Sequence, residues 1–282
     1  LDAISLQNEP RFSLYYRSAV YDGAAMRDLI KVVGARFDRE GIETRIVLPE
    51  DVANNAGRIR RFSAPTLDDP EARKYVAALA VHGYGADGRQ PAARSAVVWE
   101  GIRDIAADYD LPLWVTETSG YAIDWAGAMH QALAIDIALR HGNASMWLYF
   151  RLGELPNSRQ DALTLGGDTR TRRFDVARQY FREIRPGAVR VEAQTSASEL
   201  YPLVFLGPTR EGEGAQLVLT VVNAHSEPHA MRLEGAGLPE RWRAFRSSEQ
   251  ERGEVLDDAL TVGPIVFPPS SVTTLTGAVG AH

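Results

Sequence analysis

The sequence predicts an α/β fold, in which part of a β/α barrel is followed by an antiparallel β-sandwich. Over about the first 190 residues, short β-type runs alternate with helical patterns, as in βα units that build a parallel sheet. Beyond Gly187 only short β-type runs remain, separated by turns rich in Gly, Pro, Ser and Glu. We therefore expect two domains, a barrel portion over residues 1–187 and a β-sandwich over residues 188–282.

The candidate strands of the parallel sheet are five apolar runs: Ala3–Leu6, Thr44–Leu48, Ala77–Val81, Leu113–Thr116 and Ala144–Phe150. Four of these runs lead into loops with polar or aromatic residues, namely Asn8-Glu9, Glu50-Asp51, His82 to Tyr84, and Glu117 to Ser119. Catalytic groups of a β/α barrel lie at the C-terminal ends of its strands. The loops therefore predict a site at one end of the sheet.

Helical patterns lie between the strands. The first begins after Asp22, a favoured N-cap residue, and ends before Gly41, with its apolar positions on one face: Met26, Leu29, Ile30, Val33 and Phe37. The other predicted helices are Ala92–Tyr109, Ile123–Arg140 and Arg172–Ile184, the last followed by Pro186-Gly187.

The predicted sandwich has seven strands: Val189–Ala193, Leu203–Leu206, Gln216–Val222, His229–Leu233, Arg241–Phe245, Leu260–Val266 and Val272–Thr276. Residues Gly212–Gly214 and Ser247–Gly253 are expected to be exposed loops.

Composition narrows the class of ligand. The 282 residues carry a net charge of −6 without a run of Lys or Arg, which argues against nucleic acid and anionic membranes as partners. A neutral ligand such as a sugar fits better. The absence of cysteine excludes disulfides and thiolate chemistry. No apolar run reaches the roughly 18 residues that a membrane-spanning helix needs.

Two glutamates lie at or just beyond the C-terminal end of an apolar strand. Glu9 lies in Ser5-Leu6-Gln7-Asn8-Glu9-Pro10, and Glu117 lies in Leu113-Trp114-Val115-Thr116-Glu117. Either segment alone is also typical of a polar loop. The pair is more specific, because retaining glycoside hydrolysis needs two carboxyl groups about 5–5.5 Å apart, a nucleophile and an acid/base.

Several segments resemble glycoside hydrolase family 30, a family in the barrel clan of retaining β-glycosidases. They are AISLQNEP (3–10), VHGYG (81–85), LWVTETSG (113–120), QYFREIRPGAVRV (179–191) and PPSSVTTLTG (268–277). The fourth is the most family-specific, since it marks the passage from the last barrel helix into the sandwich. The resemblance covers nearly the whole chain, and it implies that the five strands are the fourth to eighth of a (β/α)8 TIM barrel.

The resemblance also implies an activity: O-glycosyl hydrolysis of β-linked glycans or glycosides, with Glu9 as acid/base and Glu117 as nucleophile. Asn8 would contact the sugar 2-hydroxyl, Tyr84 would hydrogen-bond the nucleophile, and His82 would line the site or serve as a structural histidine. No metal or organic cofactor is implied.

The sugar-stacking aromatic is less defined. Phe150 stands where the family usually has the Trp of a Tyr-Trp pair, and Trp147 lies on the same predicted strand. Strand alternation places Trp147 and Tyr149 on one face and Phe150 on the other, so only one set can face the barrel interior. Core packing is the alternative for each of them. Glu50 is expected either to bind a sugar hydroxyl or to cap a loop.

The family's first three barrel strands have no counterpart here. We expect upstream strands of a longer parent protein to complete the barrel, and the chain alone to be poorly stable and inactive. We also expect a secreted bacterial protein, with its signal peptide outside this chain. One alternative is a non-catalytic carbohydrate-binding protein that kept the scaffold, although two retained carboxylates argue against it. A barrel enzyme with a lone carboxylate base is another, against which the sandwich counts.

Overall fold

The computed structural model describes residues 1–13, 18–86, 92–120, 122, 124–156, 162–210, 212, 214–260 and 263–280. The chain divides into two compact units. One comprises Leu1–Ser119 and Ile137–Phe150, and the other comprises Gly120–Asp136 and Arg151–His282. A domain boundary after Gly187 stays a prediction.

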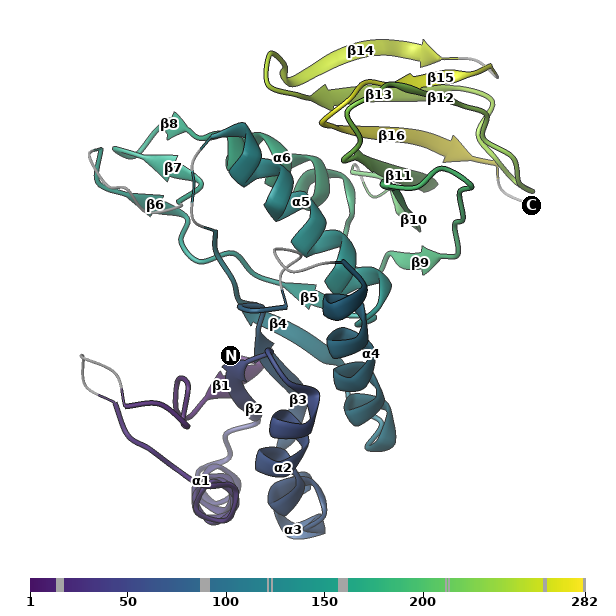
Figure 1. The fold of residues 1–282 in the computed structure, drawn as a ribbon. Helices are drawn as coiled ribbons and strands as arrows, with labels where there is room; N and C mark the ends of the chain where they lie inside the picture. Colours follow the sequence, from purple (N-terminus) through teal and green to yellow (C-terminus); the bar gives the residue numbers. More distant parts are fainter. Residues whose placement is uncertain are drawn as a thin grey trace. The chain divides into compact units, whose positions relative to one another are not determined.

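The first unit is built on a parallel sheet whose five strands follow one another in chain order, β1-β2-β3-β4-β5 (Figure 1). The strands are β1 (Ala3–Ser5), β2 (Arg45–Val52), β3 (Val76–His82), β4 (Leu113–Glu117) and β5 (Met146–Trp147). Helices α1 (Gly23–Glu40), α2 (Ala56–Leu67), α3 (Pro70–Arg73), α4 (Ala92–Asp108) and α5 (Trp125–Arg140) alternate with them along the chain. This order confirms the predicted partial β/α barrel.

The two faces of this sheet differ. On one face, strand residues such as Leu48, Leu79 and Val115 pack with Ile30 of α1 and Trp99 of α4 in the main core of the unit. The opposite face, called the inner face below, carries a small cluster of Val47, Ala78 and Ala80, against which Trp114 packs. Side chains alternate between the faces along each strand, which decides where the residues at the strand ends point.

Helix α1 forms as its sequence predicts. The Asp22 side chain accepts a hydrogen bond from the Ala25 N–H, and Gly41 takes a left-handed conformation with φ of 68°. Helices α2 and α3 were not predicted. Pro65 inside α2 and Pro70 at the start of α3 break the helical pattern in the sequence. The predicted start of α5 at Ile123 lies outside the described residues.

The second unit contains a six-stranded antiparallel sheet of order β14-β13-β16-β11-β10-β9 (Figure 1). Its strands are β9 (Val189–Val191), β10 (Leu200–Pro208), β11 (Ala215–Asn223), β13 (Trp242–Ser247), β14 (Arg252–Leu260) and β16 (Ser271–Val279). The short pair β12 (His229–Met231) and β15 (Ile265–Phe267) shares an apolar core with one face of this sheet. The antiparallel part of the predicted fold is thus confirmed.

Two predictions in this unit were wrong. Residues Ser247–Gly253 are not all loop, because β14 begins at Arg252. The predicted strand Leu260–Val266 is instead the end of β14 and the start of β15, and its Thr261 and Val262 lie outside the described residues. The charged residues of β14 hid it, since β14 is an edge strand and edge strands tolerate charge. The two-residue strands β6 (Gly153–Glu154), β7 (Thr164–Leu165) and β8 (Thr169–Arg170) are too short to show a pattern.

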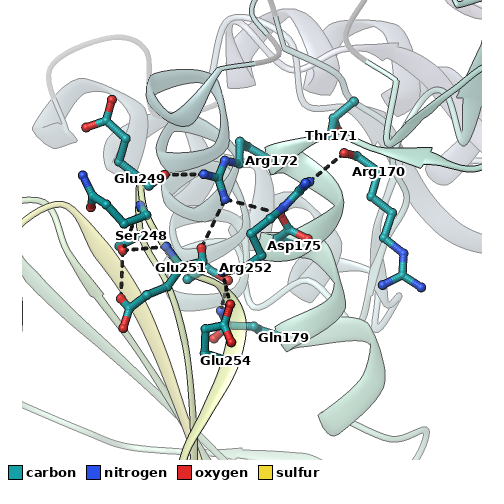
Figure 2. A network of polar contacts seen from close by, with 12 residues as sticks. Arg170, Thr171, Arg172, Asp175, Gln179, Ser248, Glu249, Glu251, Arg252 and Glu254 are labelled. Carbon is teal, nitrogen blue, oxygen red and sulfur yellow. Dashed lines mark hydrogen bonds and ion pairs between the residues drawn. The ribbon is translucent and has the colours of Figure 1, made fainter.

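Helix α6 (Arg172–Glu183) is joined to the sheet by polar contacts. Figure 2 shows Arg172 and Asp175 of α6 beside Arg252 at the start of β14. The buried Asp175 carboxylate accepts from Arg252 Nε at 2.8 Å. Deeper in the interface, Gln179 donates to the Ser247 hydroxyl at 2.6 Å and accepts from that of Thr274 at 2.9 Å. The four buried side chains in these contacts, Asp175, Gln179, Ser247 and Thr274, thus each have a partner, as their burial requires.

None of the helices in the described part of the chain combines the length and the apolarity that crossing a bilayer demands.

Candidate active site

The site lies in the first unit, at the C-terminal ends of β1, β3 and β4. Glu9 lies in the loop after β1, where its backbone adopts a positive φ of 44°. Its N–H donates to the carbonyl of Glu50 at 2.9 Å, which holds the loop to the end of β2. Two residues further, Arg11 Nε donates to the fully buried carboxylate of Asp51. The Glu9 loop is therefore fixed to β2 by a backbone and a side-chain contact.

A β-bulge directs Glu117 to the inner face. Val115 packs in the core on the helical side, so alternation alone would send Glu117 to that side as well. The pairing of β3 with β4 shifts between Val81↔Val115 and His82↔Glu117, which leaves Thr116 as the extra residue. A bulge of this kind re-aims the side chains that follow it. Glu117 consequently lies opposite His82.

His82 joins the two glutamates. Its Nδ1 lies 3.0 Å from Glu9 Oε1, and its Nε2 lies 4.0 Å from Glu117 Oε2. One oxygen of each carboxylate and a ring nitrogen of His82 all lie within 4.8 Å of one another. Glu9 and Glu117, which are 108 positions apart in the sequence (117 − 9), thus face one small space. A separation of this order is what a double displacement at a sugar carbon requires.

Tyr84 and His82 have perturbed pKa values for different reasons. Burial and the Glu117 charge raise the pKa of Tyr84 well above its ordinary value, so the phenol stays protonated and donates to Glu117 Oε1 at 2.8 Å. Burial alone would lower the pKa of His82. The hydrogen bond with Glu9 and the charges of Glu117, Glu50 and Glu9 outweigh burial and raise that pKa.

Glu50 is part of this environment. The pairing of β2 with β3 shifts between Pro49 and Asp51, and Glu50 is the residue left over, with a φ of 57°. The residue is 8% exposed, and its Oε1 accepts from the Thr116 hydroxyl at 2.6 Å. From the sequence, Glu50 is expected either to bind a sugar hydroxyl or to cap a loop. In the structure it lies within β2, and its side chain is hydrogen-bonded to Thr116 of β4.

The remaining predicted substrate contacts are less closely grouped. Asn8 is half-buried, and its carbonyl accepts from the Gln7 side chain at 2.9 Å. Trp147 pairs in register with Val115 and packs against the core on the helical side. Phe150 is 45% exposed, and its N–H donates to the Thr118 carbonyl at 2.8 Å. Sugar binding by Asn8, Trp147 and Phe150 stays a prediction.

The sequence does not predict that three further residues shape the site: Arg11, Asp51 and Thr116. Asp51 follows Glu50 at a strand end, but neither its Arg11 partner nor the bulge at Thr116 can be inferred from local pattern.

Glu9, His82 and Glu117 together offer ligand types that divalent metals accept. The sequence predicts no metal at this place, and that absence stays a prediction.

Comparison with known proteins gives a consistent result at the level of the fold. No protein-family model matches the chain, and no curated protein matches it. Among solved structures, the glycoside hydrolase family 30 subfamily 8 xylanase from Clostridium acetobutylicum matches 99% of this chain at a TM-score of 0.80 and 22% identity. A conserved exported protein from Bacteroides fragilis matches 98% at 0.80 and 14% identity. An endo-β1,6-glucanase matches 99% at 0.67 and 17% identity.

This chain spans 66%, 65% and 58% of the length of these three structures, respectively. The fold of the chain is therefore that found in the corresponding part of family 30 xylanases, as the sequence resemblance predicts.

Proposed function

We propose that this chain forms part of a retaining β-glycoside hydrolase of family 30, with Glu117 as nucleophile and Glu9 as acid/base. The observation that carries the proposal is the convergence of the two glutamates, whose nearest oxygens lie within 4.8 Å of each other and of His82. The shared fold with family 30 xylanases supports it. Among the described residues, neither carboxylate has a Lys or Arg within ion-pair distance, and both face His82.

In the first step, ionised Glu117 attacks the anomeric carbon while protonated Glu9 gives its proton to the leaving oxygen. Tyr84 occupies Oε1 of Glu117, so Oε2 is the attacking atom. His82 occupies Oε1 of Glu9, so Oε2 carries the proton that is transferred. In the second step Glu9 takes a proton from water, and the resulting hydroxide displaces Glu117 from the sugar with net retention of configuration.

The substrates we propose are β-linked oligo- or polysaccharides, or simpler β-glycosides. Two of the structural neighbours are a xylanase and an endo-β1,6-glucanase, so xylans and β1,6-glucans are the first polymers to assay. One neighbour is described as an exported protein, which supports secretion as the location where such polymers are met. Activity requires, on this proposal, the remaining barrel strands of a longer protein, because the described sheet has two unpaired edges, at β1 and β5.

Mechanism-based labelling tests the proposal. A 2-deoxy-2-fluoro β-glycoside with an activated leaving group should leave a covalent sugar on Glu117 of the full-length protein, located by mass spectrometry of peptides. Glu117→Gln should remain unlabelled. Glu9→Gln should still be labelled, because an activated leaving group needs little proton donation.

Turnover without a label on Glu117, or a label on another residue, would overturn the assignment. Sugar binding without turnover or label would instead support the non-catalytic carbohydrate-binding alternative.

A further inference from the structure

Glu50 is a buried carboxylate on the inner face that the proposed mechanism does not use. By alternation it would follow Leu48, which packs on the helical side. The bulge and the positive φ at Glu50 turn it instead across β3, toward Thr116 of β4. A non-glycine residue in this backbone region is strained, and strain of this kind persists where surrounding contacts enforce it.

Two contacts connect Glu50 with the two proposed catalytic residues. Its carbonyl accepts the N–H of Glu9 at 2.9 Å. Its carboxylate accepts the hydroxyl of Thr116, the residue before Glu117, at 2.6 Å. Thr116 is itself the bulged residue that directs Glu117 to the inner face. A single side chain and its own carbonyl thus connect the backbone of the acid/base to the backbone beside the nucleophile.

These contacts account for Glu50 better than either role that the sequence left open. It does not cap a loop, because it lies within β2 (Arg45–Val52). Glu50 is only 8% exposed and already accepts a short hydrogen bond from Thr116 within the sheet, which favours a structural contact over sugar binding. The Glu50 charge also helps to raise the pKa of His82, so Glu50 contributes to the electrostatics of the site.

We propose that Glu50 is a positioning residue that fixes the spacing between Glu9 and Glu117, acting on Glu9 through its carbonyl and on Glu117 through the Thr116 hydroxyl. This inference rests on the proposed function. If the spacing is set in this way, loss of the Glu50–Thr116 bond slows formation of the glycosyl-enzyme while the sugar still binds, because small misplacements of reacting groups reduce rate more than affinity.

The test compares Thr116→Val, Thr116→Ser and Glu50→Ala in the full-length protein, with an aryl β-glycoside as substrate. Thr116→Val removes the hydroxyl with little change in shape, and we expect kcat to fall about tenfold to a hundredfold with KM changed less than about threefold. Thr116→Ser keeps the hydroxyl and should regain most of the kcat. In the double variant, the effects of Thr116→Val and Glu50→Ala on kcat should not add, since each substitution removes the same Glu50–Thr116 hydrogen bond.

Thr118→Val is the matched control. Thr118 lies two residues beyond Thr116, is buried, and its hydroxyl has no hydrogen-bond partner among the described residues. Its kcat should match that of the wild type. If Glu50→Ala fails to fold, the comparison of Thr116→Val with Thr116→Ser still decides.

The outcomes separate this inference from the proposed function. A wild-type protein that turns over no glycoside and acquires no label on Glu117 would remove the proposed function itself. A wild type that is labelled on Glu117, with Thr116→Val equally fast or with Thr116→Ser as slow as Thr116→Val, would overturn the positioning role alone.

Discussion

At the scale of single residues, His82 is the group through which the two glutamates interact. It is almost fully buried and hydrogen-bonded to Glu9, and it lies beside Glu117. Its raised pKa means that the folded protein binds a proton at His82 more tightly than the unfolded chain does. Protonated His82 therefore compensates part of the negative charge that Glu50 and Glu117 bring to the site.

This proton gives stability a definite pH dependence. The contribution of His82 is fully present below its unfolded pKa of about 6.5 and is lost as pH rises through the higher folded pKa. We expect the free energy of unfolding of the full-length protein to fall over that window, and His82→Gln to lack this part of the decrease. Denaturant titrations at a series of pH values measure it. Equal slopes for wild type and variant above pH 6.5 would show that His82 does not gain a proton on folding.

Tyr84 contacts Glu117 through a single hydrogen bond of its phenol. Tyr84→Phe removes the O–H that donates to Glu117 Oε1 and leaves the ring in place. A hydrogen bond to a charged group contributes about 1.5–3 kcal/mol, which corresponds to roughly tenfold to a hundredfold in rate if the bond matters most in the transition state. We expect kcat on an aryl β-glycoside to fall by that factor. An increase confined to KM would mean that Tyr84 serves ground-state binding instead.

The sequence predicts these residues because each follows a strand of recognisable pattern. It does not predict what surrounds them. The Arg11–Asp51 pair joins residues 40 apart, and the Thr116–Glu50 bond joins residues 66 apart. Both bulges depend on the pairing of neighbouring strands. Such contacts arise from strand register, which no local periodicity encodes.

At the scale of elements, the Glu9 loop depends on its attachment to β2. Asp51 is fully buried, and Arg11 is 21% exposed at its side chain. Asp51→Asn leaves the Arg11 charge in a largely buried place without its counter-charge. Since Arg11 keeps some access to water, we expect the free energy of unfolding to fall by about 1–3 kcal/mol, below the range for fully buried pairs. Chemical denaturation of the full-length protein measures this change.

The chain offers a matched control for this substitution. Asp108 pairs with Arg60 at 2.7 Å, but both side chains are about half exposed, at 53% and 46%. Asp108→Asn should change stability by less than about 1 kcal/mol, as is usual for surface pairs. Similar effects of Asp51→Asn and Asp108→Asn would show that burial adds nothing to the Arg11 contact.

Prediction of the elements themselves succeeds where local chemistry decides them. The Asp22 side chain caps the start of α1, and Gly41 ends the helix because glycine readily takes the left-handed conformation. Prediction from the sequence fails where contacts with other elements decide which structure a segment adopts. Helix α2 contains Pro65, and edge strand β14 is rich in charge. In both cases packing against neighbouring elements overrides what the segment alone favours.

At the scale of the whole molecule, the architecture was predictable because βα units and a following antiparallel module have distinct periodicities. The arrangement leaves one physical problem. A β/α barrel closes with eight strands, and the described sheet has five, with β1 and β5 at its edges. Each edge strand presents unpaired N–H and C=O groups, which favour association with other chains.

These two edges limit what the chain can do without further strands. Residues 1–282 expressed alone should be prone to aggregation and should not turn over an aryl β-glycoside, whereas a polypeptide that supplies the remaining barrel strands should be active. The physical reason is that Glu9 follows edge strand β1, so the position of the proposed acid/base relies on a strand with a partner on one side only. Size-exclusion chromatography and turnover, measured side by side on both polypeptides, check this. Turnover by residues 1–282 alone that disappears in Glu117→Gln would show that β2, through Glu50 and Asp51, is sufficient to hold Glu9 in place.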